Sequence, residues 1–422
     1  MKRIWTMGIS AAALGTALGA AQSAGAQTFS LKPIIDVRLR YEGVDQAGLP
    51  RDANAVTMRV RSGVEASTGD FAVLVEAEGV LALSERYNSG LNGNSAYPIV
   101  PDPQNVELNR IQLQYRGLPK TLITVGRQRI NLDDQRFVGA VGWRQNEQTF
   151  DAARVEWTGV RRVKADVSYV WSQRTIWGVD GFGARQQAVR GDTILANVAY
   201  KMKPGTITGF AYIVDQDEAA VTYLGLPFSL SSQTYGARAA FGVPLAKGVK
   251  LNLLGSYARQ SDHHRSRVDY GADYWLGEVG IAAKGWTLTG GYEVLGADGA
   301  ARNSVRGTPL VASFQTPLAT LHKFNGWADK FLVTPPNGLR DAYASIGYVV
   351  PKIGTRGPLG LLASYHRYDS DRLSIDYGSE WNVQATMKLN KRMSALVKYA
   401  DYHAKAYATD TRKFWAEIDY VL

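Results

Sequence analysis

The chain has 422 residues, no cysteine and a formal net charge of +10. The absence of cysteine excludes a disulfide framework and thiol chemistry. The basic balance could indicate nucleic acid, but no nucleic-acid-binding motif is present, so an anionic solute or a lipopolysaccharide-rich surface is the better interpretation.

The N-terminus has the features of a secretory signal peptide. Lys2 and Arg3 form a basic start, residues 9–21 form a small apolar stretch, and Ala24-Gly25-Ala26 forms a small-residue cleavage site before Gln27. The apolar stretch is too short and too rich in alanine and glycine for a strong membrane-spanning helix. No later stretch of eighteen uncharged apolar residues exists, which argues against a helical membrane protein. We therefore expect residues 1–26 to be removed from an exported protein.

The remaining chain consists of about eighteen short amphipathic segments with a period of two. In the first of them, residues 35–42, the odd positions are apolar and the even positions are Asp36, Arg38, Arg40 and Glu42. Such alternation places the two sets of side chains on opposite faces of a strand. We predict strands at 34–42, 56–66, 71–82, 106–116, 121–130, 150–158, 163–173, 192–202, 206–215, 234–243, 249–259, 273–283, 286–295, 340–350, 358–368, 379–389, 393–402 and 411–422.

Short and long connections alternate without a break along these segments. The short ones are residues 67–70, 117–120, 159–162, 203–205, 244–248, 284–285, 351–357 and 390–392, and each contains Gly, Pro, Asn or Asp suited to a tight turn. This layout is typical of an outer-membrane barrel with short periplasmic turns and longer external loops. The last segment ends with the chain, which allows it to close a barrel against the first strand. We predict an all-β fold, a transmembrane antiparallel β-barrel of about eighteen strands that occupies residues 27–422 as one domain.

The charged face of each strand is predicted to point into the barrel. A Lys or Arg that faces lipid at mid-bilayer costs roughly 2–4 kcal/mol, so the charges fix which face is inward. This argument sends Arg38, Arg40, Arg59 and Arg61 inward and into contact with water, together with Arg110 and Arg154 farther along the chain. Eighteen strands leave an aqueous lumen, which is a conduit unless a loop closes it.

These inward charges have two interpretations. One is a solvated wall in which Arg and Glu on neighbouring strands pair and hold the barrel's shape. The other is a positively charged track, since rings of Arg and Lys are the usual way to favour anions in a pore.

Three stretches resemble the alginate export family of outer-membrane β-barrels. They are Thr124-Val125-Gly126-Arg127-Gln128-Arg129-Ile130 with the following Asp133-Asp134 and Gln135-Arg136-Phe137; Trp143 with Phe150-Asp151-Ala152; and Leu321-His322-Lys323-Phe324-Asn325-Gly326-Trp327-Ala328-Asp329-Lys330-Phe331 with Gly338-Leu339. The resemblance implies an eighteen-stranded pore whose Arg-lined constriction passes an anionic polyuronate outward.

By their place in the motif, Arg127 and Arg129 resemble members of that electropositive path. Both share parity with Ile123 and Val125, so strict alternation would face them outward. A bulge near Gly126, or a strand that ends there, would turn them inward. Lys323 and Arg340 would also reach the lumen if the long connection 296–339 folds inward.

Three other motifs are assigned no chemistry. His263 and His264 lie in a polar loop, and adjacent histidines without further ligands seldom converge on one metal ion. Ser364-x-His366 faces the lumen and invites comparison with outer-membrane lipases, but the sequence identifies no acidic partner and no oxyanion donor for it. The glycines of residues 178–183 follow no βα unit, so they form a loop and not a nucleotide site.

We predict an outer-membrane channel that passes an anionic polysaccharide, alginate-like, or a similar anionic solute by passive diffusion. The predicted path comprises Arg38, Arg40, Arg59, Arg61, Arg110, Arg127, Arg129, Arg154 and Lys323. The alternative is a substrate-specific porin for the uptake of small molecules. We expect no enzyme activity, no metal or other cofactor, and no nucleic-acid partner. The expected partners are the solute, outer-membrane lipid and lipopolysaccharide of a Gram-negative cell, with periplasmic export proteins as a further possibility.

Overall fold

The computed structural model describes residues 29–422 except 224–225, 267, 301 and 304–311. The predicted signal peptide, residues 1–26, lies outside the described residues. Among the described residues, no helix is long and apolar enough to cross a membrane.

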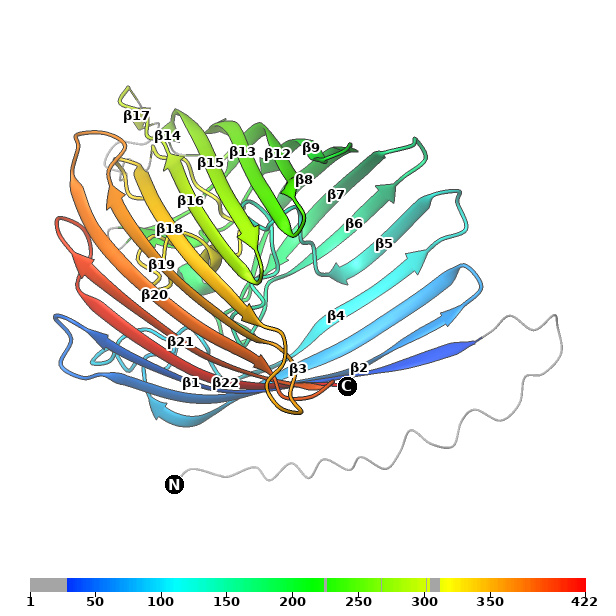
Figure 1. Ribbon diagram of the computed structural model, residues 1–422, viewed down its shortest axis with the longest axis horizontal. Helices are drawn as coiled ribbons and strands as arrows, with labels where there is room; N and C mark the ends of the chain where they lie inside the picture. Colours follow the sequence, from blue (N-terminus) through cyan, green and yellow to red (C-terminus); the bar gives the residue numbers. More distant parts are fainter. Residues whose placement is uncertain (1–28, 224–225, 267, 301, 304–311) are drawn as a thin grey trace.

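Eighteen antiparallel strands form one closed sheet (Figure 1). Each pairs with its sequence neighbour in the barrel, and the first strand also pairs with the last, so no edge remains open. They are β1 (Ser30–Gln46), β2 (Ala53–Thr68), β3 (Phe71–Arg86), β4 (Asn105–Tyr115), β5 (Thr121–Gln128), β6 (Thr149–Trp157), β7 (Val163–Arg174), β8 (Ala188–Lys201), β9 (Gly205–Val214), β12 (Ser232–Ala246), β13 (Val249–Asp262), β15 (Gly271–Ala283), β16 (Trp286–Leu295), β18 (Leu339–Val350), β19 (Leu359–Asp369), β20 (Asp376–Lys388), β21 (Met393–Ala404) and β22 (Thr411–Val421).

Short elements lie outside this sheet. Two small two-stranded sheets are the hairpin β10 (Val221–Tyr223) with β11 (Leu226–Phe228) and the pair β14 (Val268–Asp269) with β17 (Arg302–Asn303). Two 3-10 turns are η1 (Gly183–Arg185) and η2 (Leu321–Lys323).

The predicted barrel is confirmed, and all eighteen predicted strands correspond to strands of the closed sheet. Several strands are longer than predicted at the end that carries the long loops. β1 runs to Gln46 instead of 42, and β20 begins at Asp376 instead of 379. Beyond the lipid both faces of a strand can be polar, so ladder hydrogen bonds continue where the alternation of apolar residues has stopped.

The two faces of the barrel wall differ as the alternation predicts. Leu39, Val60 and Ile418 are exposed on the outside, whereas Arg40 and Arg59 are buried inside. Aromatic pairs accompany the apolar band near both ends: Trp286–Tyr348 lies beside the short turns, and Tyr257–Trp275 lies toward the loops. Such girdles suit the two membrane–water interfaces, because these rings are amphipathic.

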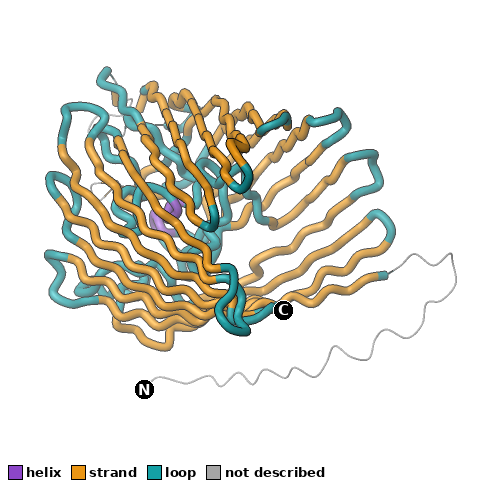
Figure 2. The backbone as a smooth tube through the Cα atoms, in the orientation of Figure 1, coloured by secondary structure: helices purple, strands orange, loops and turns teal. Residues whose placement is uncertain are grey.

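Two of the long connections fold into the barrel (Figures 1 and 2). The first inner segment, residues 129–148, links β5 to β6; the second inner segment, residues 312–338, precedes β18 and contains η2. They hold each other through backbone contacts, since Gly139 N–H donates to the carbonyl of Leu318 at 2.9 Å and Val138 forms a parallel bridge with Leu318. We call the two inner segments together the septum.

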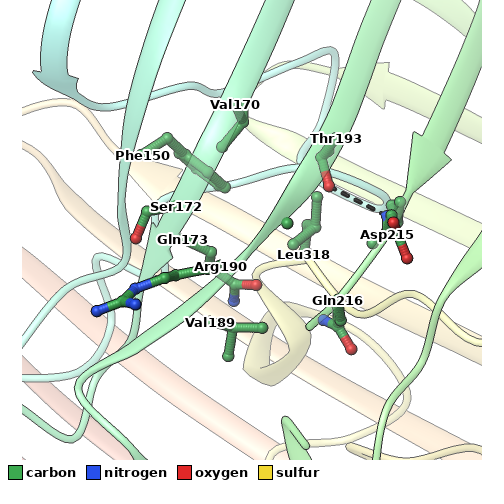
Figure 3. Close-up of a pocket in the computed structure, with 12 residues that line it drawn as sticks. Phe150, Val170, Ser172, Gln173, Val189, Arg190, Thr193, Asp215, Gln216 and Leu318 are labelled. Carbon is green, nitrogen blue, oxygen red and sulfur yellow. Dashed lines mark hydrogen bonds between the residues drawn. The ribbon is translucent and has the colours of Figure 1, made fainter. Parts of the chain in front are cut away.

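The septum also packs directly against the wall (Figure 3). Leu318 lies next to Phe150 and Val170 in a narrow crevice of about 10 Å³. Beside it, the backbone N–H of Asp215 donates to Thr193 Oγ1 at 3.4 Å. A space of this size holds at most one water molecule, so the crevice is a packing contact and not a binding site.

Candidate functional site

The septum touches the wall of the barrel on nearly every side. From the first inner segment, side chains bond to β1, β2, β4, β7, β8, β9, β12 and β16; from the second, side chains or backbone groups bond to β13, β16, β18, β20, β21 and β22. Contacts to strands around the whole circumference mean that the septum crosses the lumen, and does not merely line one side.

A glycine fixes one of these anchors. Gly326 has a φ of +84°, and a Cβ there would collide with the carboxylate of Glu380 and the hydroxyl of Tyr368. The close approach lets the backbone N–H groups of Trp327 and Ala328 both donate to Glu380 Oε1 on β20, the second at 2.9 Å. Only glycine combines this conformation with this lack of volume.

Lys398 of β21 reaches rings of both inner segments. Among the described residues its amine nitrogen contacts aromatic rings and an imidazole and forms no ion pair with a carboxylate: Nζ lies 3.7 Å from the ring centre of Trp327, 4.2 Å from that of Trp143, and 2.7 Å from His322 Nε2. The His322 ring in turn stacks on Trp143 at 4.4 Å. Cation–π contacts of a desolvated ammonium are worth about 2 kcal/mol or more each, and a carboxylate would add charge-assisted hydrogen bonds to them.

Asp329 links this cluster to other cations of the same layer. It accepts hydrogen bonds from Arg144 at 2.8 Å, from Lys413 at 2.8 Å and from His322 Nδ1 at 2.6 Å. Arg144 also pairs with Glu42 at 3.1 Å.

The protonation of the two septum groups is set by this environment. Burial lowers the pKa of His322 well below its usual value, and the neighbouring Lys398 charge lowers it further. Burial acts to raise the pKa of Asp329, but the His322, Lys413 and Arg144 side chains hold it well below its usual range. His322 is therefore a neutral ring that donates from Nδ1 to an ionised Asp329 and accepts from Lys398 at Nε2.

Two cavities lie on opposite sides of the septum. The loop-side cavity, about 460 Å³, is bordered by Gln46, Tyr97, Lys330 and Lys413. The turn-side cavity, about 410 Å³, is bordered by mid-barrel wall residues and by Lys323, Phe324, Asn325 and Trp327 of the septum. Residues 323–327 therefore face one compartment, while residues 328–330 face the other.

The predicted path arginines all form ion pairs. Their partners are Asp419 and Glu417 for Arg38; Glu417 and Asp102 for Arg40; Asp36 for Arg59; Asp36, Glu78 and Glu147 for Arg61; Glu76 for Arg110; Asp151 for Arg127; Glu76 and Glu147 for Arg129; and Asp166 and Glu156 for Arg154. This arrangement resembles the first of the two interpretations of the inward charges, in which Arg and acidic residues on neighbouring strands pair and hold the barrel's shape.

Arg40, Arg59 and Arg61 correct one part of the prediction. All three point inward, but they are only 1%, 1% and 4% exposed, whereas the sequence led us to expect contact with water. The physical reason is the inner segments, which cover this part of the wall; Trp143 of the first segment lies 4.2 Å from the Arg40 guanidinium.

Arg127 and Arg129 have different positions. In the β4–β5 ladder Arg127 pairs with Ile111, which is 46% exposed on the outer face, and its guanidinium binds Asp151 at 2.7 Å. The structure therefore corrects the prediction that placed Arg127 in the lumen: Gly126 has the positive φ of an irregular strand, +114°, but the parity of the strand is kept. Arg129 follows the end of β5 and bonds to Glu147 at 2.6 Å, as a strand that ends there allows.

Lys323 and Arg340 were expected to reach the lumen only if their connection folds inward. That connection does fold inward, and Lys323 borders the turn-side cavity, where its Nζ donates to the backbone oxygen of Asp134 at 2.7 Å. Arg340 pairs with Asp371 at 3.1 Å at the loop end of β18.

Sequence reasoning missed the cluster that contains Lys398, Asp329 and Arg144. His322 and Asp329 belong to the third family-like stretch, which was a usable signal for them. Lys398 offered none, because one lysine on a strand does not reveal which rings lie across the lumen.

A further correction concerns Ser364-x-His366. Asp341 of β18 lies with both carboxylate oxygens 3.0 Å from His366 Nδ1, so the acidic partner that the sequence did not identify is present. It lies 25 residues away in the chain, and only the pairing of β18 with β19 brings it close. In the described part of the chain, no group of three His, Asp or Glu side chains is placed to hold a metal ion.

Comparisons with known proteins agree with this architecture. The model of the alginate export family matches residues 32–273. No curated protein sequence matches the chain. Among solved structures, Acinetobacter baumannii OccAB1 superposes with a TM-score of 0.67 at 13% identity, over 93% of this chain and 96% of that one. Pseudomonas aeruginosa OpdL gives 0.63 at 14% identity over 93% and 98%, and a BenF-like porin from Pseudomonas fluorescens gives 0.64 at 12% over 93% and 98%. At these identities the structural matches are evidence for the fold.

Proposed function

The chain belongs to the alginate export family and is an outer-membrane β-barrel channel, and we propose that its cargo is an anionic polysaccharide, alginate-like, or a similar carboxylate-bearing solute. In this proposal the cargo moves by passive diffusion. We further propose that residues 1–26 are the signal peptide and that residues 27–422 form the mature barrel.

The observation that carries the proposal is the environment of Lys398. The buried amine of Lys398 is held by tryptophan rings and an imidazole, and it forms no ion pair with a carboxylate among the described residues, so a carboxylate beside it would favour its charged form. A solute carboxylate that enters this layer supplies that partner. Arg144 and Lys413, which share Asp329 a short distance away, offer the next positions along the same layer.

Passage then proceeds by exchange of partners. A solute carboxylate replaces Asp329 on one cation while the next cation is still paired internally, so no charge is left uncompensated at any step. Weak contacts at several sites suit transport, because tight binding at one site would stall it. In this scheme Arg38, Arg110, Arg129, Arg154 and Lys323 shape the potential of the lumen on either side, while the buried Arg40, Arg59 and Arg61 hold the wall.

The test is the reversal potential of single channels in planar bilayers under a salt gradient. We expect the wild-type protein to prefer anions, and Lys398→Gln to reduce that preference. The matched control is Lys164→Gln, which removes an inward lysine of β7 that is 48% exposed and already paired with Glu156. A cation-selective wild-type channel, or equal effects of the two substitutions, would contradict the proposal.

A second candidate is a porin for the uptake of small molecules, and the size of the two cavities favours it. Volumes of about 460 and 410 Å³ fit a solute of drug or disaccharide size better than a polymer chain. Oligouronates of increasing length distinguish the two candidates when they are added to a conducting channel. Interruptions of the current that continue to lengthen with chain length indicate a threading polymer, while interruption only by mono- and disaccharides indicates small-molecule uptake.

A further inference from the structure

Ser364, His366 and Asp341 form a hydrogen-bonded chain on the inner wall. Ser364 Oγ lies 3.3 Å from His366 Nε2, and His366 Nδ1 lies 3.0 Å from each oxygen of Asp341. With the proton on Nδ1, the ring donates to Asp341 and its free Nε2 accepts from the serine hydroxyl. This is the connectivity of a nucleophile, a general base and an acidic group that orients the base.

The histidine ring is held from several directions. Tyr343 of β18 stacks on it with ring centres 5.3 Å apart and planes 24° apart, and Tyr368 stacks at 5.7 Å and 17°. Asp341 is held in turn by Asn325 of the second inner segment, whose Nδ2 donates to it at 3.1 Å. The base therefore has one orientation, and the septum contributes to fixing it.

A polar donor lies directly across the ladder from the serine. Asn382 of β20 pairs with Ser364, so both side chains lie on the inner face with Cβ atoms about 4.5–5.5 Å apart. The Nδ2 of Asn382 is buried and has no hydrogen-bond partner among the described residues. A buried amide N–H group without an acceptor costs desolvation free energy. A developing oxyanion beside Ser364 would accept a hydrogen bond from it and remove that cost.

All three members of the chain border the turn-side cavity of about 410 Å³. Its wall combines apolar side chains, Leu276, Leu362 and Phe324, with the cations Arg238 and Lys323. This combination suits a small ester with a short acyl group and a polar or anionic alcohol portion, and the lumen supplies the water for hydrolysis.

We propose that Ser364, His366 and Asp341 hydrolyse small carboxylic esters in the turn-side cavity. Ser364 Oγ attacks the carbonyl carbon and its proton passes to His366 Nε2. The C–O bond of the ester then breaks, and the leaving alkoxide takes that proton. Water, deprotonated by His366, attacks the acyl–serine, and the carboxylic acid leaves as Ser364 recovers its proton. Asn382 Nδ2 donates to the oxyanion in both steps.

The experiment uses the full mature barrel refolded in detergent, with p-nitrophenyl acetate as the probe and p-nitrophenolate absorbance as the readout. We expect saturable hydrolysis that falls at least about 100-fold in Ser364→Ala and in His366→Gln. Asp341→Asn should lower kcat with little change in KM, because Asp341 orients the base and does not touch the ester. Ser168→Ala is the matched control: Ser168 is a buried serine on the inner face of β7 that does not border the turn-side cavity, and its loss should leave the rate unchanged.

A second measurement does not depend on turnover. A fluorophosphonate probe should attach to the wild-type protein at Ser364, as located by peptide mass spectrometry, and not to His366→Gln. Heat-dependent gel mobility confirms that each variant is folded, and single-channel conductance should be the same in Ser364→Ala and wild type, which separates this activity from transport. Hydrolysis that is equal in wild type and Ser364→Ala, or a folded wild-type protein that the probe does not label, would overturn the proposal.

Discussion

At the scale of single residues, Lys330 offers a pH-dependent test of the channel. It borders the loop-side cavity, and its Nζ donates to Gln46 Oε1 at 3.0 Å. Burial lowers its pKa to about 8, and the nearby charge of Lys413 lowers it further. Because the pKa is lowered, the ammonium is present below this pH and is lost as the pH rises through it. We expect anion preference to fall between about pH 7 and about pH 9, measured as reversal potential.

Two substitutions at the same position control this prediction. Lys330→Arg keeps its charge over the whole range, so its selectivity should stay constant where that of the wild type falls. Lys330→Met should show at pH 7 the reduced preference that the wild type reaches at pH 9. If Lys330→Arg titrates as the wild type does, another group is responsible.

Residues also show where sequence reasoning ends. The inward direction of Arg38, Arg61 and Arg110 follows from parity alone, because one strand contains the whole signal. The contacts of Lys398 with Trp143, and of His366 with Asp341, join segments far apart in the chain. No local pattern encodes such contacts, since they depend on the register of strands and on the course of a loop.

At the scale of elements, the hydrogen bonds that close the barrel do not involve the septum. The strands bond to one another around the whole ring, while the septum contributes side-chain contacts and a few backbone bonds to the inner wall. We therefore expect replacement of residues 321–330 by a short glycine–serine linker to leave a folded barrel. Conductance should rise severalfold because the lumen widens, and anion preference should fall because the cations Lys323 and Lys330 are removed and a wider pore screens the remaining charges more.

The control for this deletion is a glycine–serine replacement of the turn at residues 351–357. That turn joins β18 to β19 at the end with short connections and belongs to neither inner segment. Its conductance should match that of the wild type. Unchanged conductance in the septum deletion would mean that the current passes by a route that the septum does not close.

The elements themselves divide by how local their cause is. Every barrel strand was predictable, because alternation and turn residues occur within about ten residues of each other. The inward course of residues 129–148 and 312–338 was not, since both segments mix polar and apolar residues without a regular period, and such a connection suits a course outside the barrel as well as one inside. Their length was the one available indication, as long ordered connections in compact folds are usually functional.

At the scale of the whole molecule, the strand pairing that closes the barrel also fixes which side chains face lipid and which face the interior. Ile418 of β22 pairs with Leu39 of β1 at the seam where the ends of the chain meet, and it is 46% exposed on the lipid face. The next residue in the chain toward the N-terminus, Glu417, points inward and binds Arg40. We expect Ile418→Lys to lower the free energy of unfolding by roughly 2–4 kcal/mol, measured by guanidinium titration in lipid vesicles.

Ile418→Leu is the matched control and should unfold within about 1 kcal/mol of the wild type, since it preserves the apolar surface. The charged variant should also slow insertion, because the last strand must cross the bilayer before it can pair with the first. In detergent micelles, where a lysine reaches water easily, the difference between the two variants should shrink. A full-sized effect in micelles would place the cause in strand pairing at the seam and not in the lipid-facing polarity of the wall.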